Sequence, residues 1–214
     1  MIVTATVGYN VIEAIVAISA GTVASSTALI GFGLDSVVEV LSAAAVAWQF
    51  SAPDPDRRER TALRIIAVSF FALACYVTID AILTLTGWRS PEHSTVGIVL
   101  AAVSLVIMPV LSLLERRAGR ELGSASAVAD SKQTLICSYL SAAVLLGLIL
   151  NSAFGWTWAD PIAGLVIVIF AVREGLQAWR GDGCTSSIGE LTGETEPACT
   201  DEHSTSSENG SHES

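Results

Sequence analysis

Six long apolar segments, separated by polar links, constrain the fold of this chain more than any other feature of its sequence. A transmembrane α-helix needs about 20 consecutive, mostly apolar residues, and each of these segments is about that long. The mean hydropathy of +0.58 is also higher than is usual for a soluble domain. We therefore predict an all-α, polytopic membrane protein with six transmembrane helices in a lipid bilayer. The predicted spans are residues 5–23, 27–50, 62–87, 95–114, 128–151 and 158–179.

The charge of the chain divides it into two parts. Residues 1–180 carry all 11 Lys and Arg residues and 13 acidic residues, whereas residues 181–214 carry eight acidic residues and no Lys or Arg. The second part is rich in Ser, Thr, Gly and Glu and poor in large apolar residues, a composition typical of disorder. We predict a transmembrane domain over 1–180 and a disordered, acidic cytoplasmic tail over 181–214. Neither part is basic enough to indicate a nucleic-acid partner.

Basic residues near the ends of the spans predict the orientation of the chain in the membrane. Arginines gather in the links 51–60 and 115–121 and near the end of the last span, whereas the links on the opposite side contain only Arg89. This asymmetry places both termini in the cytoplasm, and we expect a multi-pass protein of the cell membrane. Tryptophans favour membrane interfaces. Those expected at the outer interface are Trp88, Trp156 and Trp158, and those expected at the inner one are Trp48 and Trp179.

The second apolar segment carries two acids, Asp35 and Glu39, with apolar sequence on both sides. A charge at mid-membrane costs about 2.5–3.5 kcal/mol on insertion scales, so acids there indicate a functional site. Residues four apart lie about 40° apart around an α-helix and share one face. Two carboxylates on one face are half of a cation site. The alternative is a pair of acids at a helix end that reaches water, which the apolar flanks disfavour.

The fifth segment repeats this spacing with Gln133 and Cys137. Counted from the outer ends at about 1.5 Å per residue, Glu39 and Cys137 lie about 20 Å deep, and Glu13 of the first segment lies about 18 Å deep. Two helices with two ligand-capable side chains each predict a four-ligand site, and mixed oxygen and sulfur ligands suit Zn²⁺. Cys137 as a packed core residue and Gln133 in an interhelical hydrogen bond are the alternatives. Asp80 lies nearer the outer surface, as part of a mouth or as a surface acid.

Three stretches of residues 1–180 resemble the cation diffusion facilitator family: ALIGFGLDSVVEVLSA in the second segment, VADSKQTLICSYLSAAVLLGLIL in the fifth and WADPIAGL in the sixth. In that family the second helix binds the transported metal through DxxxD, which here is Asp35 and Glu39. The fifth helix uses HxxxD, and here Gln133 and Cys137 stand at those positions. The family's cytoplasmic C-terminal domain is expected to be absent, with the acidic tail in its place.

The resemblance implies efflux of a divalent metal by cation/proton antiport, in a homodimer, with no cofactor besides the transported metal. Zn²⁺ is the first expectation. Crowded acids in a low dielectric disfavour double ionisation, so an empty site takes up protons that a cation then displaces. Our own inference from the sequence is that Glu13 replaces a lost metal ligand.

Two other functions stay open. The changed residues Gln133 and Cys137 are compatible with a membrane partner or sensor that has lost transport. They are also compatible with a carrier of a different cation, in which the Gln133 amide indicates a harder or larger ion. An enzyme is not expected, because the sequence contains no nucleophile–base pair, phosphate loop or HExxH motif.

Overall fold

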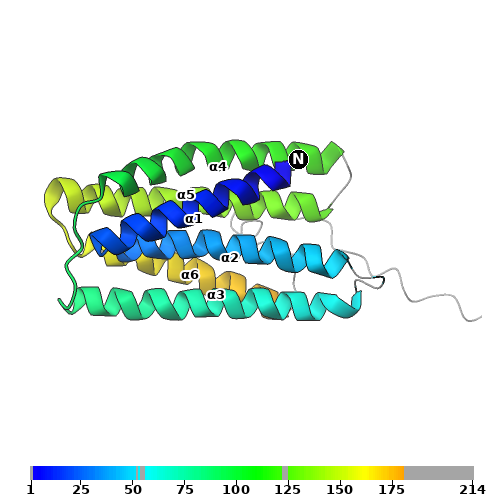
Figure 1. Cartoon of the computed structure of the whole chain (residues 1–214), viewed down its shortest axis with the longest axis horizontal. Coiled ribbons are helices and arrows are strands. Elements are labelled where there is room, and N and C mark those ends of the chain that lie inside the picture. The colour runs from blue at the N-terminus through cyan, green and yellow to red at the C-terminus, as the bar shows by residue number, and fades with distance from the viewer. Residues whose placement is uncertain (1, 52, 54–55, 122–124, 181–214) are drawn as a thin grey trace, which may run out of the picture.

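The computed structural model describes residues 2–51, 53, 56–121 and 125–180, and it places six α-helices in them (Figure 1). All six are long and apolar enough to cross a membrane, so the chain is a multi-pass integral membrane protein. The predicted all-α fold with six spans is confirmed. The helices are α1 (Ile2–Ala24), α2 (Thr27–Phe50), α3 (Asp56–Leu85), α4 (Thr95–Glu121), α5 (Ala125–Phe154) and α6 (Ala159–Arg180).

Four helices are longer than predicted: α1 runs from Ile2 to Ala24 instead of over 5–23, and the other three are α3, α4 and α5. α3 begins at Asp56 and so includes the charged run DRRER, and α4 continues to Glu121 through residues predicted to form a charged link. α5 begins at Ala125, three residues before its predicted start. Arg, Glu and Ala are good helix formers. A helix can therefore continue beyond the apolar segment that crosses the membrane, and hydropathy alone underestimates its length.

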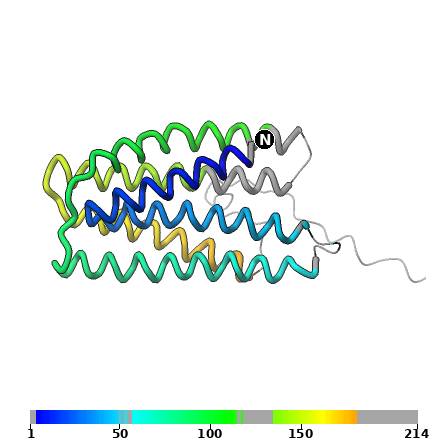
Figure 2. The backbone as a smooth tube through the Cα atoms, viewed as in Figure 1, coloured from blue at the N-terminus to red at the C-terminus, as the bar shows by residue number. Residues whose placement is uncertain are grey.

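The helices run roughly along the long axis of the molecule (Figures 1 and 2). α4 packs against α5 and α1, and α3 packs against α6. α2 contacts α1, α3, α5 and α6, so it has neighbours on several sides. A polar side chain on α2 therefore meets other helices over much of the helix circumference, and this central position matters for the two acids that α2 carries.

α1 and α2 form an antiparallel hairpin that packs closely around Gly33. A Cβ atom on Gly33 would lie 2.9 Å from Cβ of Ala17 and 3.0 Å from the backbone nitrogen of Ile18. Glycine therefore allows the backbones of the two helices to approach, as small residues commonly do between membrane helices. The close approach fixes which residues of α1 face α2.

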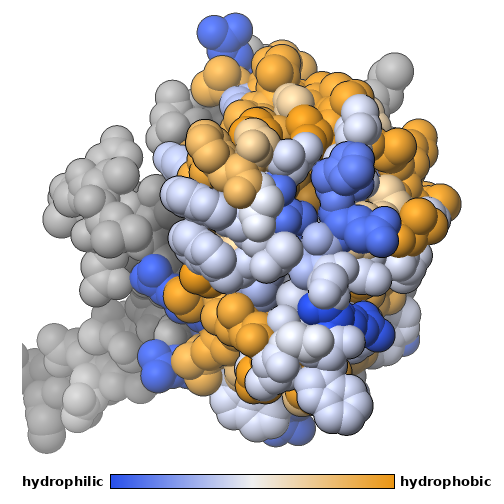
Figure 3. Space-filling model, turned by 90° about the vertical axis from the view of Figure 1, so that its left-hand side faces the viewer, coloured by the Kyte–Doolittle hydropathy of each residue, from blue (hydrophilic) through white to orange (hydrophobic). Residues whose placement is uncertain are grey.

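The outer surface of the bundle is apolar, as a lipid-facing surface must be. Large apolar side chains such as Ile12, Val106 and Val23 are 64%, 67% and 84% exposed. The chain start and the end of α6 lie toward one end of the bundle in Figure 1, and the α1–α2, α3–α4 and α5–α6 connections lie at the other. Figure 3 looks onto that second end, where hydrophilic residues gather on the face.

Candidate metal centre

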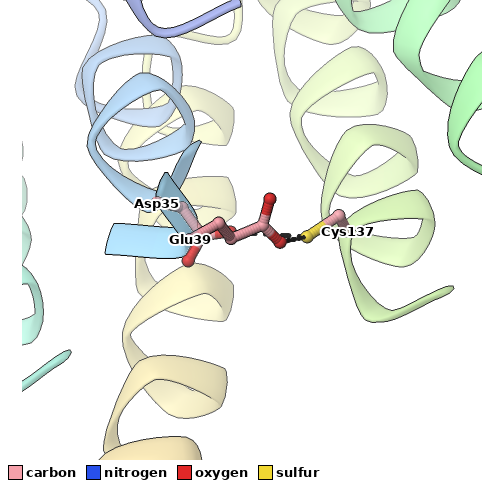
Figure 4. A group of neighbouring side chains, drawn as sticks. All are labelled: Asp35, Glu39 and Cys137. Carbon is pink, nitrogen blue, oxygen red and sulfur yellow. Dashed lines mark hydrogen bonds between the residues drawn. The ribbon is translucent and has the colours of Figure 1, made fainter. Parts of the chain in front are cut away.

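The two acids of α2 point into the bundle toward α5 (Figure 4). Asp35 is buried and Glu39 is half-buried. Each of Asp35, Glu39 and Cys137 offers a ligand atom, and these three atoms lie within 4.8 Å of one another. The fold therefore brings together three of the five side chains that the sequence predicts as metal ligands. Their role as ligands stays a prediction.

Cys137 connects the two acids across the gap between α2 and α5. Its thiol donates a hydrogen bond to Oε1 of Glu39, and its Sγ lies 3.9 Å from Oδ2 of Asp35. Cys137 is itself buried. Two carboxylates and a thiol thus converge from two helices, which is a set of donors that binds borderline-soft divalent cations once the thiol loses its proton.

The first helix also reaches this cluster, through a residue that is not among the predicted ligands. Nδ2 of Asn10 donates a hydrogen bond of 2.6 Å to Oε2 of Glu39. Asn10 is only 4% exposed, and its Oδ1 is buried without a hydrogen-bond partner in the described structure. A signal was present in the sequence, because Asn10 precedes Glu13 by one helical turn and both are polar residues in an apolar segment.

Glu13 lies outside the group formed by Asp35, Glu39 and Cys137. It is 1% exposed, and its carboxylate accepts a hydrogen bond of 2.8 Å from Ser36 of α2 and a further one from Ser104 of α4. The Ser104 hydroxyl also lies 2.8 Å from the hydroxyl of Tyr9. Glu13 is therefore held between α2 and α4 by hydroxyl groups, and its predicted role as a replacement ligand stays untested.

The remaining predicted ligand, Gln133, lies on α5 one turn before Cys137. Its side chain falls outside the described residues, so the structure does not say whether it joins the cluster.

Asp80, which was expected nearer the outer surface as part of a mouth or as a surface acid, is buried and so is not a surface acid. Its carboxylate accepts a hydrogen bond of 2.7 Å from the hydroxyl of Thr27 and forms an ion pair of 2.8 Å with Arg89. Next to it, Asp160 accepts hydrogen bonds from the hydroxyl of Ser26 at 2.5 Å and from the backbone N–H of Thr27 at 2.8 Å. Asp160 therefore caps the start of α2, although it belongs to α6.

Comparison with known proteins identifies the family to which this helical domain belongs. The family model described as the cation efflux transmembrane domain matches residues 3–180, which is nearly all of the six-helix bundle. The chain belongs to the cation efflux family. This is a family of transporters, and the match confirms the resemblance to cation diffusion facilitators that the second, fifth and sixth segments carry.

Individual relatives of this cation efflux domain agree with the assignment. The cation-efflux pump FieF of Shewanella oneidensis is 41% identical over 88 residues, which cover 41% of this chain and 28% of the pump. Transmembrane protein 163 of Xenopus laevis is 25% identical over 175 residues, covering 80% of this chain and 62% of that protein. An uncharacterized transporter of Methanocaldococcus jannaschii is 24% identical over 198 residues, covering 88% and 68%. The chain thus spans less than two thirds of the length of the first two relatives.

Proposed function

We propose that this cation efflux protein carries a divalent metal cation across the membrane in exchange for protons, with Asp35, Glu39 and Cys137 as ligands. The observation that carries the proposal is the convergence of these three side chains, from two different helices, within 4.8 Å in the bundle. The membership of the chain in a family of cation transporters supports it. A cation held between α2 and α5 can be released to either side when the two helices move apart at one end or the other.

The donor atoms favour Zn²⁺ among the common cations. Zn²⁺ takes carboxylate oxygens at about 2.0–2.2 Å and thiolate sulfur at about 2.3 Å, usually with four ligands in a tetrahedron. Neighbouring ligands of such an ion are about 3.3–3.8 Å apart by this geometry. In the group of three, Cys137 Sγ lies in hydrogen-bond contact with Glu39 and 3.9 Å from Oδ2 of Asp35, and all the ligand atoms lie within 4.8 Å of one another. Small side-chain movements would therefore close it around an ion.

Exchange for protons follows from the chemistry of the same groups. An ordinary cysteine thiol is mostly protonated at neutral pH, and the thiol of Cys137 lies beside the Glu39 carboxylate. A thiol must be deprotonated before it coordinates a metal, and cation binding therefore releases protons from the site. If the empty site takes protons from one side of the membrane and gives them up to the other, a proton gradient drives the cation in the opposite direction.

The direction of transport follows from the charges at the two ends of the bundle. The start of α3, whose sequence contains Arg57, Arg58 and Arg60, lies toward the end at which the chain begins, and the α3–α4 connection, whose sequence contains Arg89, lies at the opposite end (Figure 1). The positive-inside rule places the first end in the cytoplasm. In the plasma membrane, inward proton flow would then drive export of the metal. The assembly that we expect is a homodimer.

The test is transport by the full chain in proteoliposomes, with internal pH recorded and Zn²⁺, Co²⁺, Fe²⁺, Ni²⁺ and Cd²⁺ offered in turn. Asp35→Asn should reduce cation movement to the level of empty vesicles. The matched control is Asp80→Asn, which removes the charge from another buried aspartate of the bundle and should keep transport. Transport by Asp35→Asn would contradict the site. A wild-type chain that moves neither cations nor protons would favour the partner or sensor function.

Cys137→Ser separates the candidate cations in the same vesicles. Replacing the thiol by a hydroxyl removes the soft ligand and keeps the small side chain, so Cd²⁺ and Zn²⁺ should lose more than Co²⁺. We expect a loss of roughly 10-fold in the apparent affinity for Cd²⁺, which corresponds to about 1.4 kcal/mol. Equal losses for all five cations would show that Cys137 does not select among them.

A further inference from the structure

We propose that Asn10 of α1 supplies its side-chain carbonyl oxygen as a further ligand of the transported cation, so that three helices build the site. The inference rests on the proposed function, because it adds a ligand to the cluster of Asp35, Glu39 and Cys137.

The first observation is a buried side-chain oxygen without a hydrogen-bond partner among the described residues. Asn10 is 4% exposed, and its Oδ1 has no hydrogen-bond partner among the described residues. Leaving a buried acceptor unpaired is costly, so such atoms are rare in native proteins and call for an explanation. A carbonyl oxygen is a good ligand for divalent cations. A cation in the neighbouring cluster would supply a partner for this oxygen once the amide turns toward it.

The second observation is that the other end of the same amide is already in the cluster. Nδ2 of Asn10 lies 2.6 Å from Oε2 of Glu39, while Oε1 of the same carboxylate accepts the hydrogen bond from Cys137. The Glu39 carboxylate thus lies between α1 and α5. The two ends of a carboxamide are nearly equal in size. A half-turn of the amide would place the oxygen beside Glu39, where both can bind one ion.

The packing of α1 on α2 fixes this contact. Three successive pairs follow the antiparallel hairpin: Ala17 with Gly33, Glu13 with Ser36, and Asn10 with Glu39. The pairs are spaced by about one helical turn on each helix. Because the close approach at Gly33 sets the register, Asn10 cannot drift from Glu39 without disrupting the helix interface.

A neutral amide suits a site that works in two states. When the site holds no cation, the amide N–H groups donate to the Glu39 carboxylate; when a cation enters, the amide turns and offers its oxygen. The amide adds a ligand without adding a charge, so it needs no further proton exchange. Together with Asp35, Glu39 and Cys137, Asn10 makes a set of three oxygen donors and one sulfur donor. Such a set binds divalent cations of borderline hardness, including Zn²⁺ and Co²⁺.

The test is a Co²⁺ titration of the purified full chain, followed by absorption. Co²⁺ bound to a thiolate gives a charge-transfer band that reports Cys137, and its d–d bands report the number of ligands. Asn10→Leu removes the oxygen, and Asn10→Asp restores one without the N–H donor. The control is Asn151→Leu, because Asn151 is a buried asparagine on α5 that donates to the carbonyl of Pro91.

We expect the thiolate band in the wild type, in Asn151→Leu and in Asn10→Asp. In Asn10→Leu the dissociation constant for Co²⁺ should rise at least 10-fold, and the d–d bands should change. Unchanged affinity and d–d bands in Asn10→Leu, with the thiolate band present, would overturn the role of Asn10 alone. Equal weakening in Asn10→Asp and Asn10→Leu would also overturn it, because Asn10 would then act only as a donor to Glu39. A wild type without a thiolate band would instead overturn the proposed site itself.

Discussion

Two clusters of buried acids lie at different levels of the same bundle, and their surroundings differ. The outer cluster consists of Asp80 and Asp160 with Ser26, Thr27 and Arg89; each acid there faces hydroxyl, backbone N–H or guanidinium donors. The inner cluster consists of Asp35, Glu39 and Cys137, in which two carboxylates face each other and a thiol. Both clusters bury acids in a membrane domain, but the groups that oppose the acids are different.

This difference is the basis for proposing a structural role for the outer cluster and cation binding for the inner one. A buried carboxylate is costly unless donors or an opposite charge compensate it. In the outer cluster the protein provides this compensation itself, so the acids hold helix ends together. In the inner cluster the Asn10 amide and the Cys137 thiol donate to Glu39, and a cation between the two acids would compensate both of them. Removing an acid should therefore cost stability in the outer cluster and cation binding in the inner one.

The largest effect is expected for Glu39→Gln in the inner cluster. A ligand that binds only the folded state stabilises it by about 2.7 kcal/mol at a concentration of 100 times its dissociation constant. Zn²⁺ should therefore raise the melting temperature of the wild type in detergent and leave that of Glu39→Gln unchanged. Without Zn²⁺ the variant should be at least as stable as the wild type, because one of two facing acids is neutral. An equal Zn²⁺-induced shift in both proteins would exclude Glu39 as a ligand.

The next effect is expected for Asp160→Ala in the outer cluster. The change leaves the hydroxyl of Ser26 and the backbone N–H of Thr27 buried without their acceptor, and each unpaired group costs about 1–3 kcal/mol. The melting temperature should fall with and without Zn²⁺, while the shift caused by Zn²⁺ stays as in the wild type. Asp160→Asn keeps an acceptor and should lose less. A variant that melts normally but no longer responds to Zn²⁺ would remove the distinction between the clusters.

Much of the fold follows from the sequence, because a bilayer requires long apolar helices. Such helices can be predicted from long segments of high hydropathy in the sequence. All six spans were predicted, and the errors lie at helix ends, most of all in α3, α4 and α5, where helix formers continue past the apolar segment. The shared face of Asp35 and Glu39 also follows from their spacing on one helix. The proximity of Cys137 to them was predicted from its similar depth in the bilayer and its matching spacing with Gln133, and the family resemblance points to the same residues.

Contacts between helices were the part that the sequence did not reveal. Asp160 sits where an acid normally caps its own helix, yet it caps α2. Asn10 was visible as a polar residue in an apolar segment, but its contact with Glu39 depends on the rotation and register of α1. Both features depend on how two helices pack, and close packing around small residues such as Gly33 determines this only in the folded bundle.

The smallest effect is expected for Arg89→Gln, which tests whether the outer cluster depends on its ion pair. The side chain of Arg89 is 47% exposed, and ion pairs screened by solvent contribute about 0.2–1 kcal/mol. Asp80 keeps the hydrogen bond from Thr27, so the melting temperature should fall by no more than about 2–4 °C. High salt should lower the melting temperature of the wild type by a similar amount and have little further effect on the variant, because salt screens the same interaction. Loss of Zn²⁺ transport in a stable Arg89→Gln protein would instead place the outer cluster on the cation pathway. The loss of a weak, partly exposed ion pair would not by itself abolish transport in a protein that is still folded.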